Sequence, residues 1–260
     1  MIFSSNGANV TSQFTFPDVK SDPYPVLVQG PAGELFNFTK IGHSTNNTFA
    51  LAYATLPPNA GPFPHIHHYT NEWFYFPKGG IVIFSSNQTY PNENQIPNGV
   101  QLPKTSMHRY HTKPGDLIFG PSFYVHGFLN EENVSHSLIL VWTPDVISEY
   151  FFQVGQIVTD PNNLPPIADI NKRLLVSEAP KYGINQSSYW DEYVESWDDD
   201  WQPPLGMNAH GQELLNMLGS TVVQNVTYQT TTSHAPSIKA SPVFSCPMAF
   251  MIVHVLCILF

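Results

Sequence analysis

Two histidines separated by one residue, followed by a glutamate, constrain the fold of this chain more than any other feature. His65-Ile66-His67 is followed by Glu72 five residues after His67. On an extended strand, side chains at positions i and i+2 project from the same face. Glu72 can return to that face across a short turn, and His126 on a distant strand can supply a third imidazole. The spacing predicts a β-structure that holds one metal ion with the ligands His65, His67, Glu72 and His126.

Two longer motifs surround these four residues. The first, G-x5-H-x-H-x(3,4)-E-x6-G, is met at His65, His67, Glu72 and Gly79, with Asn59 at the leading glycine position and Gly61 two residues later. The second, G-x5-P-x-G-x2-H-x3-N, is met at Gly115, Pro121, His126 and Asn130, with Phe123 in place of the middle glycine. In these motifs the chain resembles the cupin superfamily over about residues 45–145. The replaced glycines bear on two turns and leave the ligand positions intact.

The resemblance implies an all-β fold, the cupin double-stranded β-helix or jelly-roll barrel, with N-terminal strands and a helical C-terminal extension. We expect residues 1–44 to pack as strands on the barrel and residues 45–145 to form it. Residues 146–205 are expected to form an extension with helices near 146–158 and 170–182 and an acidic, tryptophan-bearing segment. We expect residues 206–241 to be a polar spacer and residues 242–260 to be a hydrophobic tail. No internal repeat is visible, so we expect one barrel.

The composition restricts the partners. Lys and Arg number 10 against 20 Asp and Glu, which gives a formal charge of -10. A nucleic-acid partner would call for a basic surface. The 24 prolines, together with only 12% charged residues, suit a β-rich domain with many turns. We therefore expect no nucleic-acid partner. The resemblance to cupins implies a small-molecule substrate, and the oligomeric state is not indicated.

Seven N-x-[S/T] sequons are spread along the chain and favour a secreted, glycosylated protein. They begin at Asn9, Asn37, Asn46, Asn87, Asn133, Asn185 and Asn225. The alternative is a cytosolic protein whose sequons are unused and whose apolar C-terminus is a tail anchor.

The C-terminal segment Val243–Phe260 is nearly all apolar and contains both cysteines, Cys246 and Cys257. As a helix it would span about 27 Å, slightly short for a bilayer crossing. The polar, small-residue stretch before it completes the pattern of a GPI-attachment signal, with Ser233 or a neighbour as the attachment site. Residues 1–6 show no signal peptide. We therefore expect a secreted or GPI-anchored cell-surface protein whose natural start lies upstream of this Met1.

The donor set favours a divalent transition metal. Neutral imidazole suits Fe, Cu, Ni and Zn, and a carboxylate adds affinity for Mn and Fe. Closed structural zinc sites are usually rich in cysteine, which is missing from the motifs. We expect one Fe, Cu, Ni or Mn ion with an open coordination position. His68 should point to the opposite face of its strand, while His108 and His111 remain alternatives to His126, because a one-residue slip in register swaps faces.

Two classes of function follow. Resemblance to quercetinase-type cupins implies a metal-dependent dioxygenase that uses molecular oxygen on a small aromatic or enolic substrate, with Glu72 also acting as general base. The expected aromatic pocket lining is Phe74, Phe76, Phe119, Phe123 and Tyr124. A germin-like extracellular oxalate oxidase or superoxide dismutase is the alternative enzyme, although oxalate would require cationic or amide groups in the pocket. The second class is a non-catalytic, ligand-binding surface glycoprotein.

Overall fold

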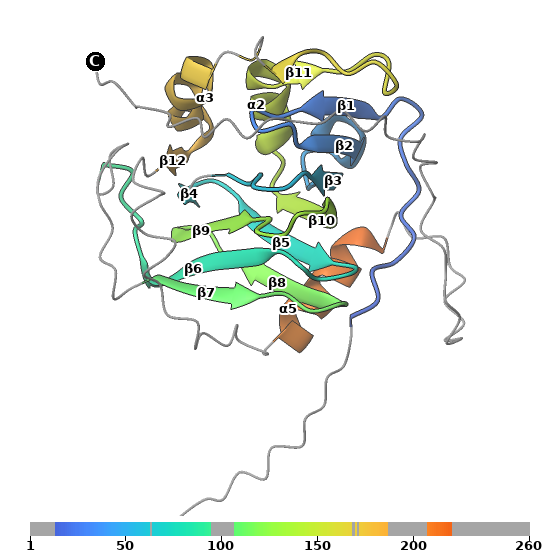
Figure 1. The fold of residues 1–260 in the computed structure, drawn as a ribbon. Helices are drawn as coiled ribbons and strands as arrows, with labels where there is room; N and C mark the ends of the chain where they lie inside the picture. Colours follow the sequence, from blue (N-terminus) through green and yellow to red (C-terminus); the bar gives the residue numbers. More distant parts are fainter. Residues whose placement is uncertain are drawn as a thin grey trace, which may run out of the picture. The chain divides into compact units, whose positions relative to one another are not determined.

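The computed structural model describes residues 14–62, 64–94, 107–167, 170, 172–186 and 207–219. Within them the chain folds into two antiparallel β-sheets that face each other as a jelly roll (Figure 1). The all-β fold class predicted from the sequence is therefore confirmed. Trp190, Trp197, Trp201 and the hydrophobic tail lie outside the described residues.

The first sheet has seven strands and the second has five. The order in the first sheet is β11 (Gln156–Ile157), β1 (Val26–Gln29), β2 (Leu35–Lys40), β3 (Ala50–Leu56), β10 (His136–Thr143), β5 (Asn71–Phe76) and β8 (Asp116–Gly120). The order in the second is β12 (Ile184–Gln186), β4 (His65–His67), β9 (Tyr124–Leu129), β6 (Val82–Thr89) and β7 (Met107–His111). The N-terminal strands extend the first sheet, since β2 pairs with β3 and β1 pairs with β2.

Alternating side chains of both sheets fill the space between them. Strand residues two apart face the same side, so one apolar set from each strand meets in a shared core. This inner set contains Phe36, Phe38, Ala50, Ala52, Ala54, Phe74, Phe76, Ile83, Ile118, Phe128, Leu138, Leu140 and Trp142.

Short helices cover the ends of the sheets. α1 (Gly42–Thr45) precedes β3, and α2 (Ile147–Val154) follows β10. The expected helix near 146–158 is therefore shorter, because the chain leaves α2 at Gly155 and pairs as β11 with β1. The second expected helix is present as α3 (Lys172–Glu178) and the 3-10 turn η3 (Ala179–Tyr182). It ends at Gly183, whose φ of 69° suits glycine.

A helix that we did not predict covers the outer face of the first sheet. α5 (Met207–Leu218) lies in the range expected to be a polar spacer and packs beside β8 (Figure 1). Leu214 and Leu218 are fully buried against Trp73, Leu117 and their neighbours. Their i, i+4 spacing gives α5 an apolar edge within a polar sequence. Among the described residues, no helix is both long and apolar enough to cross a membrane.

Position 61 requires glycine because two chain segments approach each other closely there. A Cβ atom at this position would collide with the carbonyl oxygen of Phe128 on β9. Gly61 therefore serves backbone contact, two residues after the position where the first motif expects its glycine.

Replacing Gly61 by alanine should destabilise the fold by about 1–3 kcal/mol, because the added methyl group overpacks a backbone contact. Gly211→Ala is the matched control: it lies within α5, and its Cβ would meet only ordinary contacts with Phe14 and Leu117. Since alanine is the better helix former, Gly211→Ala should be neutral or stabilising by up to about 1 kcal/mol. Urea unfolding of both variants measures the difference, and equal stabilities would contradict the assigned contact.

Candidate metal centre

Three strands bring the four predicted ligands to one place. His65 and His67 lie on β4, Glu72 on β5 and His126 on β9. β4 pairs with β9 so that His65 and His126 are direct partners. β5 belongs to the opposite sheet, where Glu72 lies next to Gly120 of β8 and Trp142 of β10. The candidate site therefore lies between the two sheets and takes ligands from both.

The four side chains are buried and converge. One ligand atom from each lies within 4.8 Å of the others. Nε2 of His65 is 3.1 Å from Nε2 of His67. Oε2 of Glu72 lies 3.3 Å from Nε2 of His67 and 3.2 Å from Nε2 of His126. These separations are close to those expected of ligands that each stand about 2.0–2.2 Å from one shared ion.

The protonation states also suit a cation. Burial alone would raise the pKa of Glu72, but the adjacent imidazoles of His126 and His67 outweigh it and lower the pKa to about 2. Burial lowers the pKa of His67, and the contact with Glu72 offsets this only in part. At neutral pH the centre therefore presents an ionised carboxylate with at least one neutral imidazole, the forms that bind metal.

Packing orients the imidazole rings. The rings of His67 and His126 stack with centroids 5.0 Å apart, and Phe74 meets His126 edge-on at 5.6 Å. Neither Nδ1 of His67 nor Nδ1 of His126 has a hydrogen-bond partner within the described part of the protein. Metal-binding histidines usually donate this second N–H to a protein group. Here neighbouring rings and the close backbone at Gly120 restrict their rotation.

The turns beside the ligands keep glycine-like geometry without glycine. Asn59, at the leading motif position, has φ 61°, and Phe123, at the middle position of the second motif, has φ 72°. Asparagine tolerates this left-handed region, whereas a bulky residue there costs about 1–2 kcal/mol. The Phe123 backbone is held by donating to His67 O at 2.9 Å and accepting from Tyr90 N at 2.7 Å. The turn that precedes His126 is thus tied directly to the His67 strand.

Asn130, the last residue of the second motif, has a structural role. Its buried Nδ2 donates to Leu56 O at 3.0 Å and to Val134 O at 2.8 Å. Its backbone also exchanges hydrogen bonds with Asn59 and Ala60. The ends of the two motifs are therefore joined to each other, which fixes β9 and His126 relative to the segment that leads into β4.

The other histidines in the described ranges lie outside the cluster. His68 packs near Phe123 at 5.9 Å, and burial lowers its pKa. His108 on β7 contacts Asn87 through Nε2 at 3.1 Å. His111 is exposed at the end of the same strand, and His136 pairs with Glu132. The structure thus brings His126, and neither His108 nor His111, to the other three predicted ligands.

The expected aromatic lining is only partly placed at the centre. Phe74 contacts His126, Phe76 lies deeper in the core, and Tyr124 precedes His126 by two residues on the same face of β9. Phe119 was wrongly assigned, because it points to the outer face and stacks on His210 of α5 at 4.1 Å. Phe123 lies in the rim turn against His68. The register explains the difference: Gly120 pairs with Glu72, so its neighbour Phe119 must face outward.

The donor chemistry fits a transition metal. Three imidazoles and one carboxylate match the preferences of Fe, Cu, Ni, Zn and Mn, and the ion's identity is not fixed by the ligands. His65, His67, Glu72 and His126 would hold it. No other group of three or more His, Cys, Asp or Glu is arranged for a metal within the described ranges.

Comparison with known proteins places this architecture in a family. Residues 33–148 match the family model described as Cupin. The range 33–148 is therefore identified as a cupin domain, as the two motifs predicted. No curated protein matches the chain.

Solved structures resemble part of the chain at low identity and with low TM-scores. KdgF from a Halomonas species is 15% identical over 47% of this chain and 89% of that chain, with a TM-score of 0.33. CapF from Staphylococcus aureus is 18% identical over 54% of this chain and 30% of its own, with a TM-score of 0.34. An oxalate oxidase structure is 14% identical over 52% and 58%, with a TM-score of 0.34. We draw no conclusion about function from these similarities.

Metal content provides the direct test of the centre. We expect the purified protein to hold about one equivalent of a transition metal, and His67→Ala or His126→Ala to lose it. His68→Ala, adjacent in sequence but outside the cluster, should keep it. Elemental analysis measures the content, and thermal unfolding shows that each variant is folded. Chelation should lower the melting temperature of the wild type, since an ion bound only by the folded state stabilises it. Equal metal content in His68→Ala and His126→Ala would refute the assignment.

Proposed function

We propose that this cupin domain is a metal-dependent oxidoreductase, most simply a dioxygenase, acting with molecular oxygen on a small aromatic or enolic substrate. The observation that carries the proposal is the buried convergence of His65, His67, Glu72 and His126. Four protein ligands leave coordination positions open on a five- or six-coordinate ion, where a scaffold site would be closed. When bound, the ion supplies Lewis-acid and redox chemistry.

The walls of the centre differ in character. On the first sheet, Phe74 presents an aromatic edge beside His126. On the second sheet, a cross-strand row runs from His65 to His126, then to Ser85 of β6 and His108 of β7, because each is the direct partner of the next. Directly paired residues share a face, about 4.5–5.5 Å apart at Cβ. Tyr110, two residues after His108, packs on the inner core and confirms that this face points inward. A planar substrate with a second polar group would match these two walls.

Glu72 is best suited to act as an ionised metal ligand. With a pKa of about 2 it is ionised at neutral pH and is a weak base. It would accept a proton only from a substrate hydroxyl that is itself acidified. We therefore assign Glu72 as a metal ligand first and as the proton acceptor for such an acidified hydroxyl second.

The polar row also supports oxidation of a small acid such as oxalate as the second candidate. Oxalate would require cationic or amide groups in the pocket, and the strand pairing brings the polar side chains of Ser85 and His108 into line with the ligands. These groups can donate hydrogen bonds to a carboxylate.

Oxygen consumption by the metal-loaded, full-length protein tests both candidates. With flavonols or simple enols, a dioxygenase consumes oxygen without releasing hydrogen peroxide. With oxalate, an oxidase converts oxalate, oxygen and two protons into two carbon dioxide molecules and one hydrogen peroxide. Glu72→Gln should lower either activity at least about 100-fold, whereas His111→Ala should retain it. A fully metal-loaded protein that consumes oxygen with neither substrate class would favour a non-catalytic binding protein.

We further propose that the protein is secreted and glycosylated. In the fold, some sequon asparagines are exposed and others are buried. Asn133 lies in an exposed turn between β9 and β10. Asn185 lies in β12, is buried, and donates through Nδ2 to Glu93 O at 3.1 Å. A glycan on Asn185 would break this contact and disturb the pairing of β12 with β4.

Expression in a eukaryotic secretory host should therefore yield a glycan at Asn133 and none at Asn185. Glycopeptide mass spectrometry after isotopic deglycosylation measures the occupancy of each site. Asn133→Gln should lose one glycan, while Asn185→Gln should leave the glycan mass unchanged. Full occupancy at Asn185 in folded protein would contradict the placement of β12, and a chain without any glycan would sink the secretory proposal.

A further inference from the structure

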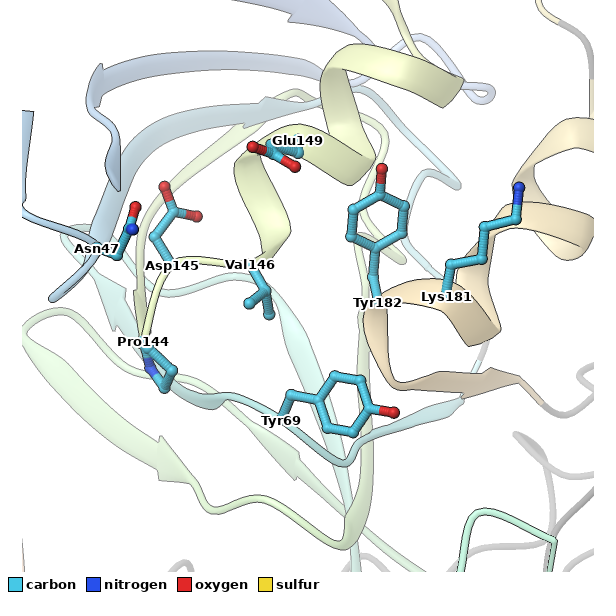
Figure 2. A pocket seen from close by; sticks show the side chains of 8 residues that line it. All are labelled: Asn47, Tyr69, Pro144, Asp145, Val146, Glu149, Lys181 and Tyr182. Atoms are coloured by element: carbon cyan, nitrogen blue, oxygen red, sulfur yellow. The ribbon is translucent and has the colours of Figure 1, made fainter. Parts of the chain in front are cut away.

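A recess separate from the metal centre lies beside the loop between β4 and β5 (Figure 2). It has a volume of about 390 Å³ and is lined by Asn47, Tyr69, Asp145, Glu149, Lys181 and Tyr182, among others. These residues come from the turn after α1, the β4–β5 loop, the start of α2 and the η3 turn. None of the four predicted metal ligands lines it. Its volume lies at the lower end of the range for small-molecule sites, about 300–1,000 Å³.

Two tyrosine rings form fixed walls of the recess. In Figure 2 the ring of Tyr69 lies below the opening and that of Tyr182 beside it. Tyr69 packs against Gly183 so closely that a Cβ there would lie 2.6 Å from the ring. Tyr182 donates its hydroxyl to Oε1 of Gln153 at 2.6 Å, and its ring contacts Tyr150 at 5.6 Å. Rigid tyrosines offer apolar contact area at a low entropic cost.

Polar groups complete the lining. Asp145 is held in place by accepting hydrogen bonds from Gly42 N at 2.5 Å and from Ser148 N and Oγ at 3.0 and 2.6 Å. Glu149 is exposed and projects toward the recess in Figure 2. It makes no hydrogen bond or ion pair with the described part of the chain, so its carboxylate is available to a ligand. Asn47 and Lys181 add amide and ammonium donors.

The charged groups around the recess are stabilised by the surrounding protein. Asp145 and Glu149 lie at the N-terminus of α2, where the helix dipole stabilises negative charge. Nζ of Lys181 is paired with Oε2 of Glu178 at 2.6 Å. An anion would be repelled by the two carboxylates, and both carboxylates can accept hydrogen bonds from hydroxyl groups of a ligand. A neutral ligand with many hydroxyl groups fits better, because each hydroxyl can both donate and accept a hydrogen bond.

From this combination we infer that the recess is a saccharide-binding site, for a neutral mono- or disaccharide unit whose C–H face packs on Tyr69 and Tyr182 and whose hydroxyls donate to Glu149 and Asp145. Its openness admits either a free sugar or the terminal unit of a larger glycan. The site is independent of the oxidoreductase proposal, since it shares no ligand residue with the metal centre.

Sugar binding by the full-length, metal-loaded protein tests the inference. The Asn46→Gln background removes the sequon next to Asn47, so that a glycan of the protein itself cannot compete. The probes are methyl glycosides of glucose, mannose and N-acetylglucosamine, the corresponding disaccharides, and insoluble cellulose and chitin. Ligand-observed NMR and isothermal titration measure the soluble probes, and sedimentation measures the insoluble ones. Binding of a glycoside identifies a single-unit site, and binding of the polymer alone identifies recognition of chain ends.

Three variants locate the binding. Tyr69→Ala and Glu149→Gln should each lower the affinity about tenfold, through lost packing and a lost charge-assisted hydrogen bond. Tyr24→Ala, at a tyrosine that is 89% exposed and outside the recess, should leave it unchanged. Metal content should stay constant throughout. The inference is overturned if none of the saccharides binds at millimolar concentration, if binding is equal in Glu149→Gln and the wild type, or if tetramethylammonium or phosphate occupies the recess in their place.

Discussion

The burial of three imidazoles and one carboxylate against each other is the constraint on which the rest of this structure depends. Glu72 and His67 are each 3% exposed, and His126 is 1% exposed. Removing such groups from water costs several kcal/mol per charge unless they are paired. The cluster offsets part of this cost internally, since the imidazoles keep Glu72 ionised, and a bound cation would offset more. Without a bound cation this cluster would destabilise the core, and its four converging ligand atoms are suited to bind one.

The surrounding fold fixes the register of β4, the short strand that carries two of the ligands. β4 has only three residues and pairs with β9 at only two positions, so its register needs support from outside the strand pair. Phe123 provides some by binding His67 O from a left-handed backbone conformation. Asn130 provides more by joining both motif ends. β12 pairs with the other edge of β4 at three positions. The strain at Phe123, about 1–2 kcal/mol, is tolerated because these contacts overdetermine the turn.

The sequence predicted the features that depend on local spacing. Alternation along β4 and β5 was sufficient to align His65, His67 and Glu72, and the second motif singled out His126. Features that depend on which strands pair were not accessible. Phe119 was placed inside because the pairing of Gly120 with Glu72 cannot be read from one strand. The row that leads from His126 to Ser85 and His108 arises only when β9, β6 and β7 meet. α5 was missed because the partner of its apolar edge, Leu214 and Leu218, lies almost one hundred residues earlier at Leu117.

The metal centre and the recess use the two ends of one short loop. His68 to Thr70 connect His67 to β5, and the loop is held by His68 N donating to Gly183 O at 2.7 Å and by Thr70 Oγ1 donating to Pro144 O at 3.2 Å. Both anchors belong to the segments that carry Tyr182 and Asp145. The position of Glu72 relative to His67 is thus set from outside the jelly roll, by the same segments that shape the recess. A saccharide bound between Tyr69 and Tyr182 would bridge the loop to η3 and restrict it further. The physical link between the two sites is therefore the rigidity of this loop, and no chain of contacts through the core is required.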